Sequence, residues 1–318
     1  MTATTTPRPL DAAGLAGGVL CCALWGGNAV AAKFCIAPDG LPPLGGAAIR
    51  FAWSLPVVAF VCARGGTGFL RPWRDAPLFL LHGLLTAMQI GLFNWGTSHS
   101  EAGRSSVFIN IHPFVTAPLA WFLLGEHLGV RGLAGLFAAA VGVVVILSRA
   151  LLQGGGLTGD LVVIASGLVF GIQTIAQKLT FPRISPRTLL FGQTAIALVL
   201  IAIASALSEP LSSYHWTRAS FWGVFYQGVG SSGLCFSLWL ILLGRYSASR
   251  MATITFLTPI FGISMGSALR GEPLTPTLVI GGALVGLGIV LVAGGKPIES
   301  TSTPTPAGLL AGATDTGP

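Results

Sequence analysis

The chain has 318 residues, of which 53% are hydrophobic and only 8% are charged. An average soluble domain carries roughly 25% charged residues, so this composition excludes a soluble globular protein and indicates an integral membrane protein. The net charge of +7 does not indicate a nucleic-acid-binding protein, because the 17 basic residues are scattered through short connections and form no basic run.

Ten segments are apolar and long enough to cross a bilayer, which takes about 20 residues each. They are 12–36, 43–63, 76–98, 102–124, 129–148, 158–179, 186–208, 220–243, 248–270 and 276–294. The first segment is longer than the apolar core of a signal peptide, so we expect it to be retained. Residues 1–11 and the Pro-, Thr-, Ser- and Gly-rich tail 295–318 are predicted to be disordered.

The distribution of Lys and Arg predicts the orientation in the membrane. With the N-terminus inside, eleven of the 17 basic residues fall on the cytoplasmic side and five on the outer side. Cytoplasmic connections of membrane proteins are enriched in basic residues. We therefore predict a multi-pass protein of a cell membrane with both termini in the cytoplasm.

The sequence is internally duplicated. Pro113 and Pro259 are each followed by eleven residues and then Gly-Glu, and the glycines beyond them also correspond, at an offset of 146 (259 minus 113). The stretch 24–33 matches 169–178 at an offset of 145. The repeats are thus 12–148 and 158–294, with five spans each. Because five is odd, the second copy enters the membrane from the opposite side, which predicts an inverted-topology repeat typical of alternating-access transporters.

Ten spans in two halves, with the duplicated Pro-x11-Gly-Glu pattern, resemble the EamA-type branch of the drug/metabolite transporter superfamily. The resemblance covers residues 12–294. Within that branch the chain is similar in length and layout to YddG-type exporters of aromatic and other neutral amino acids. The resemblance implies a carrier that exports or exchanges such metabolites, with a central cavity lined by spans 1–4 and 6–9. It implies peripheral positions for spans 5 and 10.

The carboxylates bear on how transport is driven. All ten Asp and Glu residues lie near span ends or in the tails. A carboxylate in the middle of the membrane is the usual proton or sodium relay, so its absence favours facilitated diffusion or exchange over proton antiport. Proton coupling through His82, His99 or His112 stays open, because imidazole titrates near neutral pH. A channel or membrane scaffold without alternating access is the competing class.

Matching stripes on the first and sixth spans are the predicted substrate site. Trp25 and Asn28 share one helical face, and Phe170, Gln173 and Gln177 repeat that face in the second half. Aromatic rings and amides together suit a neutral, amphipathic substrate. The alternative is that the amides hydrogen-bond between helices and serve packing. Further residues expected to face the cavity are Gln89, Asn94, Asn110 and Trp239.

Three further features are predicted to act with this site. Arg50 lies about 10 Å into the second span and is either a counter-ion for a substrate carboxylate or an arginine that reaches back to the interface. Lys33 and Lys178 are equivalent by the repeat and either close the two mouths by bonding to the other half or anchor the helices. Pro113 and Pro259 interrupt the backbone hydrogen bonds within their spans and are candidate hinges.

Other chemistry is not predicted. Gly230-Ser231-Ser232-Gly233 matches the GxSG of intramembrane serine proteases, but no histidine follows His215 to act as the base. No metal-ligand spacing or phosphate-binding glycine loop occurs, so we expect no enzyme activity, metal or cofactor. Glu126 and Glu272 are expected to be stabilised by the amides that open spans 5 and 10. The expected partners are a small-molecule substrate and the lipid bilayer, and the oligomeric state is open.

Overall fold

The computed structural model describes residues 10–36, 39–66, 73–126, 129–153, 157–271 and 274–293. Within these residues the chain is helical throughout and contains no strand. The α-helices are α1 (Ala12–Cys35), α2 (Pro43–Arg64), α3 (Ala76–Ser98), α4 (Ala102–Phe108), α5 (Pro113–Leu124), α6 (Val130–Gln153), α7 (Leu157–Thr180), α8 (Pro186–Ser208), α9 (Arg218–Phe225), α10 (Phe236–Arg245), α11 (Ala248–Ile254), α12 (Thr258–Arg270) and α13 (Pro276–Ala293).

These helices make ten membrane spans, which confirms the predicted fold class. Eight helical segments of the described chain are long and apolar enough to cross a membrane, and α6 and α13 add shorter apolar stretches. Three spans consist of two α-helices in line: α4 with α5, α9 with α10, and α11 with α12. The observed ends lie within two residues of the predicted ones, except that α6 continues five residues further, to Gln153. Ala150, Leu151 and Leu152 are strong helix formers and extend it.

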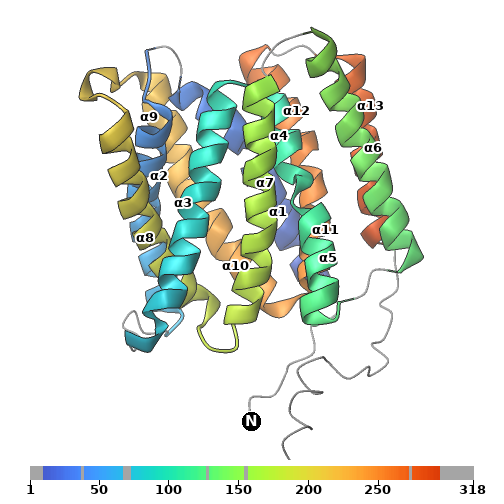
Figure 1. The fold of residues 1–318 in the computed structure, drawn as a ribbon, viewed down its shortest axis with the longest axis horizontal. Coiled ribbons are helices and arrows are strands. Elements are labelled where there is room, and N and C mark those ends of the chain that lie inside the picture. The colour runs from blue at the N-terminus through green and yellow to red at the C-terminus, as the bar shows by residue number, and fades with distance from the viewer. Residues whose placement is uncertain are drawn as a thin grey trace, which may run out of the picture.

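Successive spans run antiparallel, and the two halves have opposite orientations (Figure 1). We call the end of the bundle where α1 begins the near end and the opposite end the far end. α1 runs from near to far, whereas its repeat partner α7 runs from far to near (Figure 1). α3 packs along α7 and α2 along α8, so the halves are interleaved rather than side by side. The predicted tails, apart from Leu10 and Asp11, lie outside the described residues.

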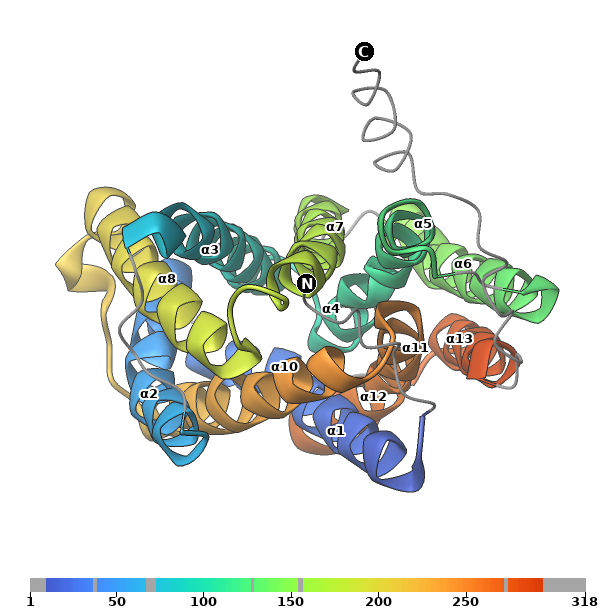
Figure 2. The ribbon, with the colours of Figure 1, turned by 90° about the horizontal axis from the view of Figure 1, so that it is seen from below.

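Helices α6 and α13 form a pair at one side of the bundle (Figures 1 and 2). They cross where glycines allow the backbones to touch: a Cβ atom on Gly142 would lie 2.5 Å from the carbonyl oxygen of Gly281, and a Cβ on Gly288 would lie 2.5 Å from that of Gly135. These four glycines belong to the duplicated pattern, and small residues permit this close approach between membrane helices. The fifth and tenth spans are therefore peripheral.

The fourth and ninth spans are broken at equivalent places. A 3₁₀ turn of three residues, Ile109–Ile111, separates α4 from α5 and ends two positions before Pro113. A second 3₁₀ turn, Thr255–Leu257, separates α11 from α12 and ends two positions before Pro259. Proline lacks the amide hydrogen that would continue the α-helical pattern, so each break lies where the sequence predicts it.

The eighth span contains a feature that the sequence did not predict. Residues Tyr226–Cys235, between α9 and α10, form a π-helix of ten residues. Its repeat partner α3 is a continuous α-helix from Ala76 to Ser98. π-helical turns are rare and often occur at functional sites. The two halves therefore differ in backbone structure at this span.

Candidate functional site

A narrow cavity lies between the two halves, at the level of the helix breaks. Its volume is about 40 Å³. Its wall consists of Trp25, Asn28, Ala29, Arg50, Gln89, Ile90, Phe93, Ser106, Ile109, Asn110, His112, Phe170, Phe236, Thr255 and Thr258. The residues from Trp25 to His112 belong to the first half and the rest to the second. A site made by both halves changes shape whenever the halves move relative to each other.

Aromatic side chains form one part of this wall. The Trp25 ring contacts Phe170 and Phe236 edge-on, with 5.7 Å between the ring centroids in each case. Trp239 lies behind Trp25 at 5.0 Å and is 1% exposed, but it is not among the lining residues. The indole Nε1 of Trp25 has no hydrogen-bond partner among the described residues. Trp25 therefore offers both a ring face and an unused donor.

The two stripes on α1 and α7, which correspond in the sequence repeat, differ in how many of their residues line the cavity. Trp25 and Asn28 on α1 line the cavity, and so does Phe170 on α7. Gln173 donates its side-chain amide to Thr86 Oγ1 at 2.6 Å, and Gln177 donates to Gln193 Oε1 at 3.1 Å. Neither glutamine is among the lining residues. On α7 the amides thus join helices, which is the alternative reading of this stripe.

The other predicted polar residues also divide into two groups. Gln89 and Asn110 line the cavity and donate from their amide nitrogens to Ser166 Oγ, at 3.2 Å, and to the Ser106 carbonyl, at 2.6 Å. Their amide oxygens therefore remain as acceptors. Asn94 is 1% exposed and lies off the wall. Its Oδ1 and Nδ2 atoms have no hydrogen-bond partner among the described residues.

Arg50 on α2 is the only cation in the wall among the residues that the structure describes. Its side chain is 1% exposed, so it does not reach back to the interface. The guanidinium Nε donates to Ser232 Oγ, and Nη2 donates to Ser231 Oγ at 3.3 Å. Both serines belong to the π-helix Tyr226–Cys235. The Gly-Ser-Ser-Gly stretch that resembles a protease motif therefore provides the two serine hydroxyls that bind Arg50.

The charge of Arg50 is not neutralised by the protein. No described carboxylate forms an ion pair with it, and its Nη1 atom is buried with no hydrogen-bond partner. A buried charge is costly unless an opposite charge and hydrogen bonds accompany it. The two serine hydroxyls orient the guanidinium but leave Nη1 without a partner and the positive charge without a counter-ion among the described residues.

His112 adds a further unpaired nitrogen to the wall. Its Nε2 lies 2.7 Å from Thr255 Oγ1, whose own hydrogen is donated to the carbonyl of Ala252 at 2.6 Å. The hydroxyl therefore accepts from Nε2, and this hydrogen-bond network assigns the histidine proton to Nε2. Nδ1 then has a free lone pair and no partner among the described residues. This assignment makes His112 a neutral acceptor that faces the same cavity as Arg50.

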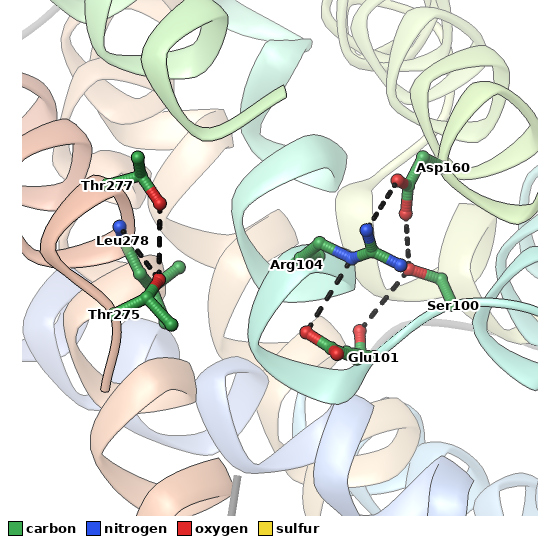
Figure 3. A network of polar contacts seen from close by, with 7 residues as sticks. All are labelled: Ser100, Glu101, Arg104, Asp160, Thr275, Thr277 and Leu278. Carbon is green, nitrogen blue, oxygen red and sulfur yellow. Dashed lines mark hydrogen bonds and ion pairs between the residues drawn. The ribbon is translucent and has the colours of Figure 1, made fainter. Parts of the chain in front are cut away.

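At the far end of the bundle a charged network joins the two halves (Figure 3). Asp160, in the first turn of α7, has a side chain that is fully buried. It lies 3.4 Å from Arg104 Nη1 on α4 and accepts a hydrogen bond from Ser100 Oγ. Glu101 contributes a longer contact, 3.7 Å from Arg104 Nε, and is 57% exposed. Asp160 is thus an end-of-span carboxylate that joins the second half to the first.

Hydrogen bonds also join the two halves at the near end. Asp11, which N-caps α1, accepts a 2.6 Å hydrogen bond from the Tyr246 hydroxyl. Glu126 accepts from the backbone amides of Ala248 and Ser249, at 3.0 and 2.9 Å. The carboxylate of Glu126 therefore caps α11 of the other half rather than its own neighbour α6, through the same attraction to exposed amides. Glu272 lies outside the described residues.

Lys33 and Lys178 occupy equivalent positions at opposite ends. Lys33 Nζ donates to the Ser98 carbonyl at 3.4 Å, and Lys178 Nζ donates to the Leu243 carbonyl at 2.6 Å. Each acceptor lies 65 residues further along the chain, at the end of the third span of the same half. Both of these bonds lie within the half to which the lysine belongs. Their role in gating stays a prediction.

Several lining residues were not singled out in the sequence. Thr255 and Thr258 lie at the break before α12, and Ser106 lies on α4. Single hydroxyl side chains carry little signal in an apolar span, because they also satisfy backbone carbonyls within their own helix. The repeat offers a clue in hindsight, since Thr258 corresponds to His112 in the other half. The described residues contain no group of His, Cys, Asp or Glu that could hold a metal ion.

Known proteins resemble this chain in both of its halves. Residues 12–148 and 157–294 each match the model of the EamA-like transporter family. The chain is 26% identical over 295 residues to a probable amino-acid metabolite efflux pump of Salmonella typhimurium, covering 88% of this chain and 94% of that protein. It is 23% identical over 271 residues to the uncharacterized transporter YoaV of Bacillus subtilis, covering 84% and 92%.

Two further matches extend the comparison. The chain is 28% identical over 242 residues to a probable terminal-alkyne amino-acid exporter of Streptantibioticus cattleyicolor, which covers 74% of this chain and 79% of that one. A protein of known crystal structure superimposes with a TM-score of 0.71 at 20% sequence identity, over 88% of this chain and 98% of the other. That structural likeness concerns the fold alone.

Proposed function

Because the chain belongs to the EamA-like transporter family, we propose that it is an alternating-access carrier that exports or exchanges small metabolites, chiefly neutral amino acids including aromatic ones. The family makes it a multi-pass membrane transporter and not an enzyme. The substrate, the direction of transport and the location in a cell membrane with both termini inside are our proposals.

The observation that carries this proposal is the shared cavity at the two helix breaks. Its wall takes residues from both halves, and the 3₁₀ turns before Pro113 and Pro259 adjoin it. Backbone that departs from the α-helix is tolerated in a membrane where it lines a cavity. A carrier needs this combination, because the segments that bend must be the ones that open the site.

The chemistry of the wall supports an amphipathic substrate. Trp25, Phe170 and Phe236 offer ring surfaces, while Asn28, Gln89 and Asn110 offer amides. Two relatives are named for amino-acid export, one as a probable amino-acid metabolite efflux pump and one as a probable terminal-alkyne amino-acid exporter. We take Trp25, Asn28, Arg50, Gln89 and Asn110 as the core of the substrate site.

The contacts between the halves at the two ends support alternation. The Arg104–Asp160 network holds the far end, and the contacts of Asp11 and Glu126 hold the near end. In the proposed cycle one set of contacts breaks while the other persists, so the cavity opens to one side at a time. The described lining residues include no Asp or Glu. We therefore expect transport to follow the substrate gradient.

Counterflow in proteoliposomes tests this function. Vesicles containing the purified full-length chain are preloaded with unlabelled L-phenylalanine, and uptake of external labelled L-phenylalanine is followed. A carrier gives saturable uptake that preloading accelerates, whereas a pore gives neither effect. Uptake that is unaffected by preloading would remove the carrier proposal. The same assay with an imposed pH gradient separates exchange from proton coupling through His112.

A further inference from the structure

The cavity wall presents an uncompensated positive charge. Arg50 is the only charged side chain among the described lining residues if His112 is neutral, and Arg50 is 1% exposed. Its Nε and Nη2 atoms are held by Ser232 and Ser231, and both hydroxyls are neutral. Nη1 has no hydrogen-bond partner among the residues that the structure describes. A guanidinium placed in this way matches a carboxylate, which supplies both the missing charge and the missing acceptor.

The polar atoms without hydrogen-bond partners near the wall would bind a carboxylate more strongly than an ammonium. An incoming carboxylate finds Arg50 Nη1 and the free Trp25 Nε1 donor. An incoming ammonium finds neutral acceptors among the described lining residues: His112 Nδ1, Thr258 Oγ1 and the amide oxygens of Gln89 and Asn110. Leaving a buried charge unpaired costs far more than losing a hydrogen bond to a neutral acceptor. Removing the carboxylate from the substrate should therefore weaken binding more than removing the ammonium group.

We propose that this cavity selects its substrate by the carboxylate, through Arg50, and accepts apolar or aromatic monocarboxylates whether or not they carry an amino group. Amino acids are then one subset of the substrate class, and the corresponding deaminated acids are another. Amines without a carboxylate are excluded, because their charge repels the guanidinium. The inference rests on the proposed function, since it assigns selectivity to the same site.

Binding of three probes that share one ring tests the inference. The probes are L-phenylalanine, 3-phenylpropionate, which lacks the amino group, and 2-phenylethylamine, which lacks the carboxylate. Binding to the purified full-length chain in detergent is measured by titration calorimetry. We expect the two acids to bind within about tenfold of each other, because only hydrogen bonds to neutral acceptors distinguish them. We expect the amine to bind about 30-fold more weakly or worse.

Variants of the arginine sharpen the test. Arg50→Gln should weaken both acids about 30-fold and leave the amine no weaker, because it removes the charge that repels the amine. Arg50→Lys should recover part of the acid binding, since it restores charge but not the planar fork. Arg64→Gln, at the other end of the same helix, is the matched control and should bind the acids as the wild type does.

Distinct outcomes separate this inference from the carrier function. Equal binding of 2-phenylethylamine and 3-phenylpropionate, or no binding of any probe, overturns the inference even where counterflow of another metabolite persists. Unchanged acid affinity in Arg50→Gln overturns it as well. Acid binding that depends on Arg50 without any counterflow supports the inference and contradicts the carrier. If Arg50→Gln does not fold, the probe series on the wild type and Arg50→Lys still decides.

Discussion

Trp25 is the residue at which the two halves meet in the cavity. Its ring contacts Phe170 of α7 and Phe236 of α10, both from the second half, while its own helix belongs to the first. Aromatic contacts of this kind contribute roughly 0.5–1.5 kcal/mol each beyond the area that they bury. A substrate ring in the cavity would add to this set of contacts.

Trp25→Ala removes a ring surface and the Nε1 donor together. It should therefore lower the maximal rate of counterflow divided by the half-saturating substrate concentration by about tenfold or more. Trp25→Phe should recover the part that depends on the ring. Initial rates over a range of substrate concentrations check this. Trp222→Ala is the control, because Trp222 is 56% exposed and lies outside the wall. Unchanged rates in Trp25→Ala would place the site elsewhere.

The Arg104–Asp160 pair also acts at the scale of single residues. Arg104→Gln leaves a fully buried carboxylate without its cation and should lower the stability by roughly 3 kcal/mol. The double variant Arg104→Gln/Asp160→Asn should recover most of that loss, because both charges are gone. Thermal unfolding in detergent measures both effects.

The control uses the same arginine and its exposed partner. Glu101→Gln removes a carboxylate that is 57% exposed, and exposed ion pairs contribute roughly 0–1 kcal/mol. A small change there beside a large one in Arg104→Gln would identify Asp160 as the partner that matters. If the double variant is no more stable than Arg104→Gln, the buried pair does not account for the effect.

Among the elements, the broken spans are the ones that the sequence predicts best. Proline dictates where α4 ends and α5 begins, and the repeat dictates the same for α11 and α12. The π-helix in the eighth span could not be predicted in this way, because no residue type marks it and its repeat partner α3 is regular. Its role in holding Arg50 depends on contacts between residues 182 positions apart.

If the breaks are hinges, restoring a regular helix should slow the cycle. Pro113→Ala and Pro259→Ala are expected to lower the maximal rate of counterflow while leaving the half-saturating concentration unchanged, because the prolines do not line the cavity. Pro118→Ala is the matched control, since Pro118 lies within α5 and away from the 3₁₀ turn. Equal rates in all three variants and the wild type would show that the breaks do not limit transport.

Across the whole molecule, the topology follows from two sequence signals. Hydropathy locates the ten spans, and the odd number of spans per repeat requires the halves to be inverted, as α1 and α7 are (Figure 1). The candidate substrate site is predicted less completely from the sequence than the topology is. Helical periodicity placed Trp25, Asn28 and Phe170 on the wall, but it could not distinguish them from Gln173 and Gln177, whose partners lie on other helices.

The predicted orientation is tested by reporter fusions. A fluorescent protein that folds only in the cytoplasm should be bright when fused after Gly65, at the near end, and dark after Gly40, at the far end. Alkaline phosphatase, which is active only outside, should give the opposite result. The expectation follows from the excess of Lys and Arg at the near end. The reverse pattern in both reporters would invert the orientation without changing the fold.

The glycine crossing of α6 and α13 has a consequence for how such a chain could arise. Gly142 meets Gly281 and Gly288 meets Gly135, and the repeat relates each contact to the other. The interface is therefore isologous, as between two copies of one protein related by a two-fold axis. Two separate five-helix chains inserted in opposite directions could form the same interface. In the single chain this interface keeps two-fold symmetry, whereas Arg50 in one half and the serines that hold it in the other half break that symmetry.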